Sequence, residues 1–268
     1  MSLRGKLALV TGASSGIGAA AALTLAKHGC SVALTGRQES ALKELMDKIK
    51  QELGTDAPKV GCFPGDVTQD SDVERIVQES VSSLSDNGKL DILVNCAGVL
   101  KGGAVGDASM ENWDFNFNVN ARGVFCFMTK AIPYMIKAKG EPTSSIVNVS
   151  SVNGLQSFGG VAAYCASKAS VDMLTDCAAV DLAPKGIRCN TVNPGVIVTE
   201  LQKRGGLSDE QYDNFLKRSV EVTHPLGRVG KPEEAAEAIL FLADSSKSDF
   251  ITGTHLTIDG GRRCLGAR

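Results

Sequence analysis

A glycine-rich turn near the start of the chain constrains its fold more than any other feature. The apolar run at residues 6–11 leads into Thr-Gly-Ala-Ser-Ser-Gly-Ile-Gly, and an alanine-rich segment with the composition of a helix follows. Gly12, Gly16 and Gly18 leave backbone N–H groups bare at the start of this helix, where the helix dipole favours a pyrophosphate. The sequence therefore predicts a strand–turn–helix unit that binds a dinucleotide, although such a turn alone could be purely structural.

Strand-like and helix-like segments alternate along the rest of the chain. Apolar runs with little alternation are typical of buried central strands, and the amphipathic segments between them are typical of covering helices. The expected strands are 6–11, 31–36, 60–63, 90–94, 145–149, 187–192 and 254–258. The expected helices are 17–27, 39–53, 71–84, 110–117, 121–139, 161–182 and 232–243, with a bend near Pro133. This order predicts an α/β fold, a Rossmann-type doubly wound parallel sheet of about seven strands with helices on both faces.

One segment interrupts this alternation. Residues 194–223 separate a strand from the next sheet-flanking helix, and insertions at that end of a strand often line ligand sites. We therefore expect a substrate loop at about 194–223, with a helix of its own that Ser208 caps. No linker or internal repeat divides the chain, so we expect a single dinucleotide-binding domain over residues 1–268.

The composition is that of an ordinary globular protein and excludes several functions. The net charge is -2, 43% of the residues are hydrophobic, and neither charge sign collects in a block, so nucleic acid is not an expected partner. No stretch approaches the roughly 20 apolar residues of a membrane span, and the first residues lack the hydrophobic core of a signal peptide. The eight cysteines are scattered without a C-x-x-C pair. We therefore expect a cytoplasmic protein without a metal site, nucleic-acid partner or membrane insertion.

Ser151, Tyr164 and Lys168 form the candidate catalytic group. Tyr164 and Lys168 are four residues apart, so on a helix they project from the same face. A free tyrosine has a pKa of about 10, too high for efficient proton exchange at neutral pH, and a nearby ammonium lowers it. Ser151 follows an apolar strand and could orient a substrate oxygen. The alternative is an ordinary helix pair, with the tyrosine in the core and the lysine in solvent.

Seven short motifs occur in the order that is typical of the short-chain dehydrogenases/reductases. They are T-G-A-S-S-G-I-G at 11–18, G-D-V at 65–67, N-C-A-G at 95–98, N-V-N at 118–120, V-S-S at 149–151, Y-C-A-S-K at 164–168, and N-P-G with a later threonine at 193–199. Each motif is weak evidence alone, but their order is specific. The chain therefore resembles this family from residue 6 to about residue 261, and within it the carbonyl and 3-oxoacyl reductases. Cys96 is a small departure, since the family often has asparagine or alanine there.

The resemblance implies a catalytic tetrad of Asn120, Ser151, Tyr164 and Lys168. Tyr164 would donate a proton to a carbonyl oxygen during reduction and accept one during oxidation. Lys168 would lower the pKa of Tyr164 and bind the nicotinamide ribose, and Ser151 would hold the substrate oxygen. Asn120 would anchor a water that links Lys168 to solvent. Neighbouring asparagines compete for this last role, and each of them could instead cap a helix or a turn.

The resemblance also implies the residues that hold the cofactor. They come from the glycine turn, from the ends of the following strands and from the start of the substrate loop: Thr11, Gly12, Ser14, Ser15, Gly16, Ile17, Gly18, Arg37, Asp66, Val67, Asn95, Ala97, Gly98, Tyr164, Lys168, Pro194, Gly195 and Thr199. In this set Asp66 would bind the adenine, Asn95 would steady the sheet, and Thr199 would bond the carboxamide. The structural alternatives are a turn for Asp66 and a helix cap for Thr199.

The end of the second strand predicts which nicotinamide cofactor binds. NAD enzymes have an acidic side chain there that receives the ribose 2′-hydroxyl, whereas an arginine accommodates a 2′-phosphate. This chain has Gly36 followed by Arg37, with no acid. A guanidinium matches phosphate bidentately, so we expect NADP(H) to be preferred over NAD(H). The alternative is a surface arginine that pairs with Glu39.

These observations lead to one expected function. We expect an NADP-dependent short-chain dehydrogenase/reductase that transfers hydride between NADP(H) and a carbonyl or secondary alcohol, with Tyr164 as general acid/base. One alternative is a non-catalytic NAD(P)-binding regulatory or scaffolding protein of the same fold. Another is a dehydratase or epimerase, although those relatives usually have a larger C-terminal region. Members of the family usually form oligomers, so the resemblance implies a homotetramer or homodimer.

Overall fold

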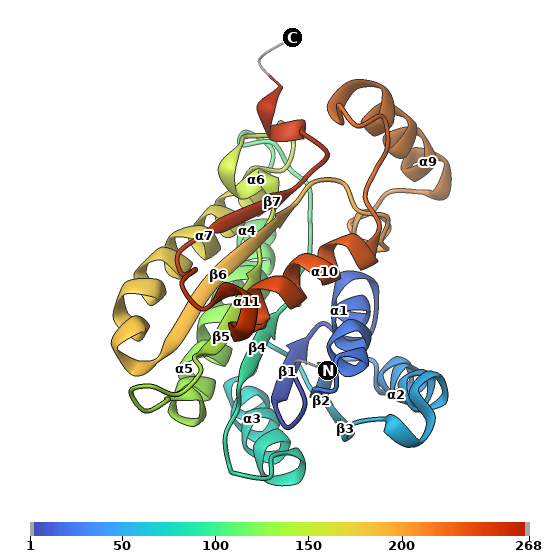
Figure 1. Cartoon of the computed structure of the whole chain (residues 1–268). Helices are drawn as coiled ribbons and strands as arrows, with labels where there is room; N and C mark the ends of the chain where they lie inside the picture. Colours follow the sequence, from blue (N-terminus) through green and yellow to red (C-terminus); the bar gives the residue numbers. More distant parts are fainter. Residues whose placement is uncertain (1–2, 266–268) are drawn as a thin grey trace.

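A seven-stranded parallel sheet forms the centre of the molecule (Figure 1). The computed structural model describes residues 3–265, and its strands lie in the order β3-β2-β1-β4-β5-β6-β7. They are β1 (Leu7–Thr11), β2 (Ser31–Gly36), β3 (Val60–Pro64), β4 (Ile92–Asn95), β5 (Ser144–Val149), β6 (Ile187–Pro194) and β7 (His255–Ile258). The predicted doubly wound sheet is confirmed. The strand order reverses between β1 and β4, the point at which such folds bind ligands.

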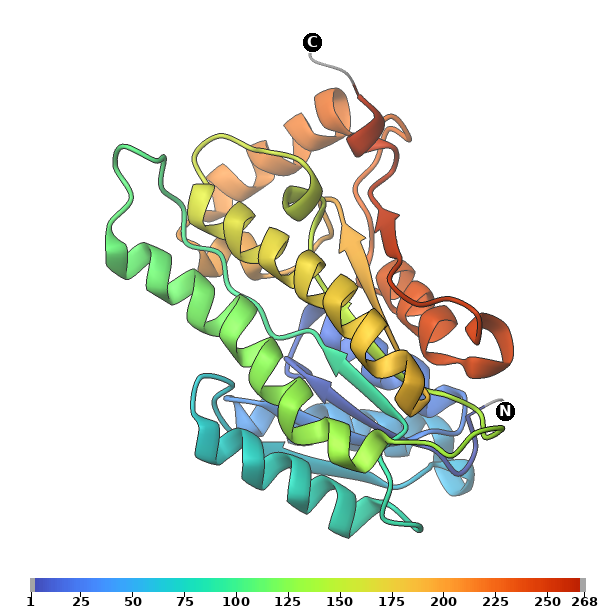
Figure 2. The ribbon, with the colours of Figure 1, turned by 90° about the vertical axis from the view of Figure 1, so that its left-hand side faces the viewer.

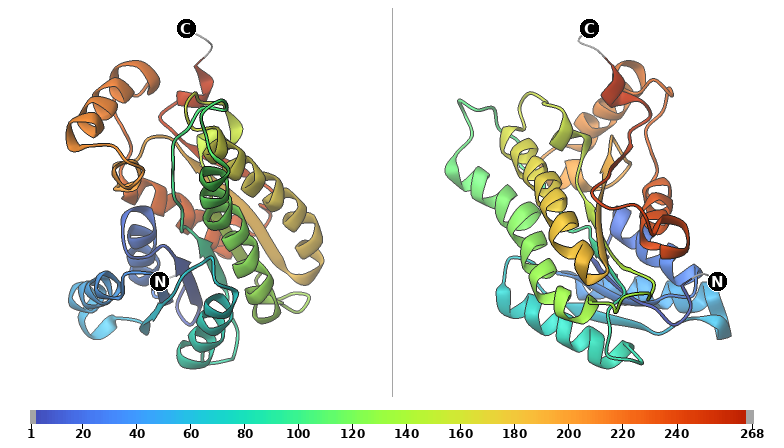
Figure 3. Two further views of the ribbon diagram at one scale, coloured as in Figure 1. Left: turned by 180° about the vertical axis from the view of Figure 1, so that it is seen from behind. Right: turned by 60° about the vertical axis from the view of Figure 1, so that its left-hand side comes forward.

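Helices cover both faces of the sheet (Figure 2; Figure 3). One face carries α1 (Gly16–Lys27), α2 (Glu39–Leu53) and α10 (Pro232–Ala243), and the other carries α3 (Asp70–Leu84), α5 (Gly123–Met135) and α7 (Ala162–Leu182). The first strand shows why the two layers form. Ala8 and Val10 pack in the core on the α1 side, whereas Leu7 and Leu9 pack in the core on the α3 side. Successive strand residues point to opposite faces, so a continuous apolar run needs cover on both.

The helix that was expected at 121–139 differs from the prediction at both ends. A π-helical turn at Asn118–Arg122 joins α4 (Met110–Phe117) to α5 without a break. The helix contains Pro133 and ends at Met135, before the predicted end at residue 139. Turns of the π type occur frequently at functional sites, and this one directs Asn120 into the interior.

The segment between β6 and α10 folds into two short helices beyond the carboxyl end of β6. These are α8 (Leu201–Arg204) and α9 (Asp209–Arg218), and a π-helical turn follows at Ser219–Thr223. The predicted cap is present, because the hydroxyl of Ser208 accepts a hydrogen bond from the backbone N–H of Gln211 at 3.2 Å. Figure 1 shows α9 standing at the same end of the molecule as α6 (Val152–Leu155).

Two searches of the described chain bear on function. No helix within residues 3–265 is both long and apolar enough to cross a membrane. Over the same residues, no group of three or more His, Cys, Asp or Glu side chains is arranged to hold a metal ion. All eight cysteines are free thiols.

Candidate active site

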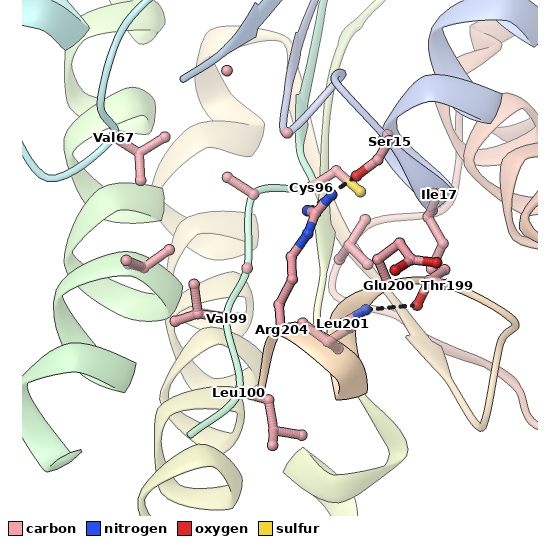
Figure 4. A pocket seen from close by; sticks show the side chains of 18 of the residues that line it. Ser15, Ile17, Val67, Cys96, Val99, Leu100, Thr199, Glu200, Leu201 and Arg204 are labelled. Carbon is pink, nitrogen blue, oxygen red and sulfur yellow. Dashed lines mark hydrogen bonds between the residues drawn. The ribbon is translucent and has the colours of Figure 1, made fainter. Parts of the chain in front are cut away.

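A cavity of about 620 Å³ opens at the carboxyl ends of the strands and is bordered on one side by α8 (Figure 4). Most of the residues that the sequence singled out lie on its wall: Gly12, Ser14, Ser15, Gly16, Ile17, Gly18, Arg37, Asp66, Val67, Ala97, Gly98, Ser151, Tyr164, Lys168, Pro194, Gly195 and Thr199. Thr11, Asn95 and Asn120 are buried behind that wall. The fold thus gathers residues from distant parts of the chain around a single space.

The turn after β1 depends on glycine for its close approaches. Gly12 has φ +67°, and an added Cβ would lie 2.8 Å from backbone atoms of Ala97. A Cβ at Gly18 would overlap the carbonyl oxygen of Gly12. The first turn of α1 contains no acidic residue, and Ser15 at its N-cap makes no side-chain capping bond. The positive end of α1 therefore meets the cavity with no side-chain anion of its own.

Thr11 and Asn95 position the wall rather than form it. The hydroxyl of Thr11 accepts hydrogen bonds from the backbone N–H groups of Cys96 and Ala97, each at 3.0 Å. The amide of Asn95 donates to the side-chain oxygen of Asn148 at 2.8 Å. These contacts tie the ends of β1, β4 and β5 together, so that the glycine turn and the segment after β4 keep a constant spacing.

Arg37 and Asp66 lie at the end of the cavity beside β2 and β3. Glu39 pairs with Lys43 at 2.7 Å. Arg37 forms no ion pair with any residue that the structure describes, so the alternative of a pair with Glu39 is wrong. Asp66 accepts hydrogen bonds from the backbone N–H and the hydroxyl of Thr68, each at 2.9 Å. Asp66 therefore shapes a turn, as its structural alternative predicts, and also reaches the cavity.

Tyr164 and Lys168 are both buried in α7, with 5% and 4% of their surfaces exposed. The alternative with the lysine in solvent is therefore wrong. The ammonium of Lys168 lies 5.9 Å from the ring centroid of Tyr164 and donates to the carbonyl oxygen of Val149 at 2.8 Å. Ser151 caps α6, since its hydroxyl accepts from the backbone N–H of Asn153 at 3.1 Å. The hydroxyl, phenol and ammonium all border the same cavity.

Burial controls the proton affinity of Tyr164 and Lys168. It raises the pKa of Tyr164 to about 12, although a hydrogen bond with Ser151 and the charge of Arg262 act in the opposite direction. Burial also lowers the pKa of Lys168 to about 8. The predicted lowering of the Tyr164 pKa by Lys168 is not the net effect, because desolvation of the phenolate outweighs the surrounding charges. At neutral pH both groups carry their protons, which suits Tyr164 to act as a proton donor.

Asn120 fastens the cavity wall to α7. Its side-chain oxygen accepts from the backbone N–H of Val99 at 2.8 Å, and its amide nitrogen donates to the carbonyl oxygen of Val99 at 2.9 Å and to the hydroxyl of Ser167 at 3.0 Å. A Cβ added at Gly98 would lie 3.5 Å from both the Asn120 oxygen and the Lys168 ammonium. Asn120 is thus a neighbour of Lys168, and its role in anchoring a water stays a prediction.

The sequence missed the contribution of α8 and its surroundings. Arg204 projects from α8 across the cavity, and its Nη1 donates to the hydroxyl of Ser15 at 3.2 Å (Figure 4). Tyr212 donates its hydroxyl to the carbonyl oxygen of Thr199 at 3.0 Å, which holds α9 against the start of the loop. His224 accepts from the backbone N–H of Val196 at 3.2 Å and has a structural role. The sequence located this segment, but it carried no signal for which side chains turn inward.

A parallel sheet of this order, with a glycine turn and a buried tyrosine–lysine pair at one cavity, defines a class of oxidoreductases. The chain belongs to the short-chain dehydrogenase/reductase family. A family model described as enoyl-(acyl carrier protein) reductase matches residues 12–263.

Individual relatives are similar over nearly their whole lengths. The 3-oxoacyl-(acyl-carrier-protein) reductase FabG of Thermotoga maritima is 40% identical, over 97% of this chain and 99% of that protein. The 2,3-dihydro-2,3-dihydroxybenzoate dehydrogenase of Bacillus subtilis is 35% identical, over 97% and 96%. A crystal structure of a Caenorhabditis elegans short-chain dehydrogenase/reductase of unknown function, solved with cofactor, matches with a TM-score of 0.90 at 31% identity, over 99% and 98%.

Proposed function

We propose that the chain transfers hydride between NADP(H) and a carbonyl or secondary alcohol, with Tyr164 as general acid/base. One observation carries the proposal: Tyr164 and Lys168 are both buried, and both border the cavity that the glycine turn also lines. Burying an ammonium costs free energy, as the lowered pKa of Lys168 reflects. A regulatory or scaffolding protein has no use for that cost, whereas proton transfer beside a substrate does.

We assign a step to each polar group. During reduction, the hydroxyls of Ser151 and Tyr164 hold the carbonyl oxygen, and Tyr164 donates its proton as negative charge develops there. The ammonium of Lys168, charged below a pKa of about 8, stabilises the phenolate that remains. The carbonyl oxygen of Val149, 2.8 Å from the Lys168 ammonium, keeps that charge in place. Oxidation of an alcohol uses the same groups in the reverse direction.

The cavity residues fit a phosphorylated dinucleotide. The N–H groups at the start of α1 and the close glycine turn suit a diphosphate. The guanidinium of Arg37 lines the cavity without an ion pair among the described residues, which suits a 2′-phosphate. Ala97 and Gly98 are small, so they leave room on the adenosine side of the cavity. Thr199 lies beside Gly16, at the other end of the glycine turn. When bound, the cofactor supplies or accepts the hydride.

The names of two relatives support a proposal for the substrate class. The Thermotoga relative is named for a 3-oxoacyl substrate, which is a ketone. The Bacillus relative is named for a dihydroxylated ring acid, whose hydroxyl groups are alcohols. We assign this chain a small-molecule substrate with one of these groups, held between Ser151, Tyr164 and the segment after β6.

The test is the Tyr164→Phe variant, assayed by NADPH absorbance on a panel of ketones, 3-oxoacyl thioesters and cyclic alcohols. The variant should lose turnover and keep NADPH binding, whereas Tyr134→Phe, on α5, should keep both. Substantial residual activity in Tyr164→Phe overturns the mechanism. If the wild-type protein binds NADPH but turns over no member of the panel, the result favours a non-catalytic regulatory or scaffolding protein. Product formation without net change in NADPH indicates a dehydratase or epimerase.

We also propose a cytoplasmic homotetramer or homodimer. The outer surfaces of α4, α5 and α7 expose the large apolar side chains Trp113, Phe125, Met173 and Val180, with between 40% and 75% of each exposed. Apolar side chains in such number on neighbouring helices are typical of association surfaces. Light scattering of the purified protein tests the assembly, because a monomer at micromolar concentration contradicts it. Imaging of a tagged chain tests the location.

A further inference from the structure

A buried carboxylate lies on α7, one turn after Lys168. Asp172 follows Lys168 by four residues, so the two side chains lie on the same face of the helix, and Asp172 is 5% exposed. Aspartate is almost never fully buried unless its oxygens have partners, because removing an unpaired charge from water is unfavourable. The contacts of Asp172 therefore indicate what the residue does at this position.

Asp172 is linked to the backbone of Ser151 through Asn193, near the end of β6. The amide nitrogen of Asn193 donates to Asp172 Oδ1 at 2.9 Å and to the carbonyl oxygen of Ser151 at 3.0 Å. Carboxylate and carbonyl oxygens only accept hydrogen bonds, so the nitrogen of the amide must face them. The amide oxygen of Asn193 accepts from the hydroxyl of Thr191 at 2.6 Å. The buried amide therefore has one orientation, which joins Asp172 to Ser151.

The second oxygen of Asp172 lies against α6, the helix that Ser151 caps. A Cβ added at Gly154 would overlap Asp172 Oδ2, so this position of α6 accepts no side chain unless its neighbours shift. The backbone N–H of Gly154 donates to the same Ser151 carbonyl oxygen at 2.9 Å. The hydroxyl of Ser150 donates to the carbonyl oxygen of Lys168 at 3.1 Å. Asp172 therefore contacts both residues that bind the carbonyl oxygen of Ser151.

Asp172 also supplies negative charge beside Lys168. Burial lowers the pKa of Lys168, whereas negative charge on Cys96 or Asp172 would raise it. Burial raises the pKa of the Cys96 thiol to about 12, so this thiol is neutral where Lys168 titrates. Burial raises the pKa of Asp172 as well, and its neighbours oppose this effect: Asn193, Ser150, His255 and Lys168. The carboxylate of Asp172 is therefore the group that favours the charged form of Lys168.

His255, on β7, faces Asp172 from the side away from Lys168. Its Nδ1 lies 2.8 Å from the hydroxyl of Thr191 and 3.5 Å from Asp172 Oδ1, and its Nε2 lies 3.0 Å from Asp176 Oδ1. The side chain of Asp176 is 43% exposed, so solvent reaches this end of the cluster. Asp172 is at the buried end, where water screens its charge least.

We propose that Asp172 is a positioning residue for the proposed reaction. Through Asn193 it fixes the backbone at Ser151, and its negative charge keeps Lys168 protonated. The inference rests on the proposed function for the roles of Ser151 and Lys168. Ser151 then presents its hydroxyl to the substrate oxygen from a fixed backbone, and Lys168 keeps the charge that stabilises the phenolate of Tyr164.

The first experiment follows the proton on Lys168 without any substrate. In protein labelled with carbon-13 at the lysine ε-carbons, the Lys168 signal is the one that Lys168→Arg lacks, and NMR records its shift as the pH rises. Asp172→Asn keeps the size of the side chain and removes its charge, so Lys168 should lose its proton at a lower pH than in wild type. Asp172→Ser removes the same charge with a smaller side chain. Asp181→Asn, exposed on the same helix, is the matched control and should leave the titration unchanged.

The second experiment measures reduction of the most active panel substrate as a function of pH. In Asp172→Asn the alkaline decline of kcat/KM should begin at a lower pH than in wild type. The loss at acidic pH, where Lys168 is charged in both proteins, should be smaller. Asn193→Ala keeps the carboxylate and removes the link to Ser151, so kcat should fall by about tenfold across the pH range.

Three results would contradict the proposal. The first is a Lys168 titration that coincides in wild type, Asp172→Asn and Asp172→Ser, and the second is an equal shift in Asp181→Asn. The third is a kcat for Asn193→Ala within about twofold of wild type. If the wild-type protein reduces no substrate but the Lys168 titration shifts in Asp172→Asn alone, the proposed function fails and the effect of Asp172 on Lys168 is supported.

Discussion

The guanidinium of Arg262 lies over the ring of Phe158, with its Cζ 5.1 Å from the ring centroid. Its Nη2 also donates to the side-chain oxygen of Asn153 at 3.4 Å. Both contacts fall on the segment that joins Ser151 to Tyr164, so the last turn of the described chain is attached to the segment between two catalytic candidates. The positive charge lowers the pKa of Tyr164 against the larger effect of burial. The C-terminal end of the fold therefore influences the proton that the proposed reaction moves.

Replacing Arg262 by glutamine should raise the pKa of Tyr164. Removing the charge makes the phenolate less favourable, so alcohol oxidation, which needs a proton acceptor, should begin at higher pH in Arg262→Gln than in wild type. The measurement is the pH profile of kcat/KM in the oxidative direction. Arg263→Gln is the matched control, because Arg263 is exposed and its side chain forms no hydrogen bond or ion pair with the described residues between Ser151 and Tyr164. Superimposable profiles for wild type and Arg262→Gln would show that the charge has no such effect.

Reduction should lose activity as the pH rises through about 8. Burial lowers the pKa of Lys168 to about 8, so its charge is present below that pH and disappears above it. Without the ammonium, the phenolate formed on Tyr164 lacks its stabilising partner. In Lys168→Arg the charge does not titrate in this range, so the variant, although slower, should show no alkaline decline near pH 8. A decline at the same pH in both proteins assigns it to a different group.

Alanine at Gly12 should destabilise the fold as well as the cofactor site. The φ of +67° costs an L-residue ~1–2 kcal/mol, and the added Cβ would lie 2.8 Å from the backbone of Ala97, which cannot move aside cheaply. Chemical denaturation should therefore show a loss of at least about 2 kcal/mol in the free energy of unfolding. Gly106→Ala is the control, since a Cβ there meets no atom within 4 Å. Equal stability of the two variants contradicts the argument from close approach.

The sheet could be predicted because the sequences of its strands are compatible with few other folds. An apolar run such as Leu7–Thr11 needs apolar cover on both faces, and only a layered α/β arrangement supplies it for strands that alternate with helices. The π-helical turn at Asn118–Arg122 could not be predicted. It changes the backbone hydrogen bonds without changing the composition, so hydrophobic periodicity does not report it.

In the candidate site, too, features that depend on neighbouring residues could be predicted, whereas contacts between distant residues could not. The spacing of Tyr164 and Lys168 is local and was visible in the sequence, but the burial of Lys168 depends on β5, whose Val149 carbonyl oxygen accepts from its ammonium. The contact between Arg204 and Ser15 joins residues 189 positions apart and belongs to no motif. Contacts of this kind are set by how the segment after β6 packs, which pattern alone does not determine.

Arg37 should account for the proposed preference for NADPH. In Arg37→Ala the 2′-phosphate loses a bidentate partner, so the ratio of kcat/KM for NADPH to kcat/KM for NADH should fall by about tenfold or more, while kcat/KM for NADH changes little. An unchanged ratio would show that Arg37 does not bind the 2′-phosphate.

Gly36→Asp tests the same preference from the opposite direction. A Cβ at Gly36 would lie 3.4 Å from the hydroxyl of Ser14, an ordinary contact, so the backbone there accepts a Cβ. Its carboxylate should accept a hydrogen bond from the ribose 2′-hydroxyl of NADH and repel the 2′-phosphate of NADPH. Combined with Arg37→Ala, it should reverse the preference to NADH. Gly36→Ala is the control for the added Cβ, because it carries no carboxylate and should leave the proposed preference for NADPH in place. A double variant that still prefers NADPH would place the 2′-phosphate elsewhere in the cavity, away from the end of β2.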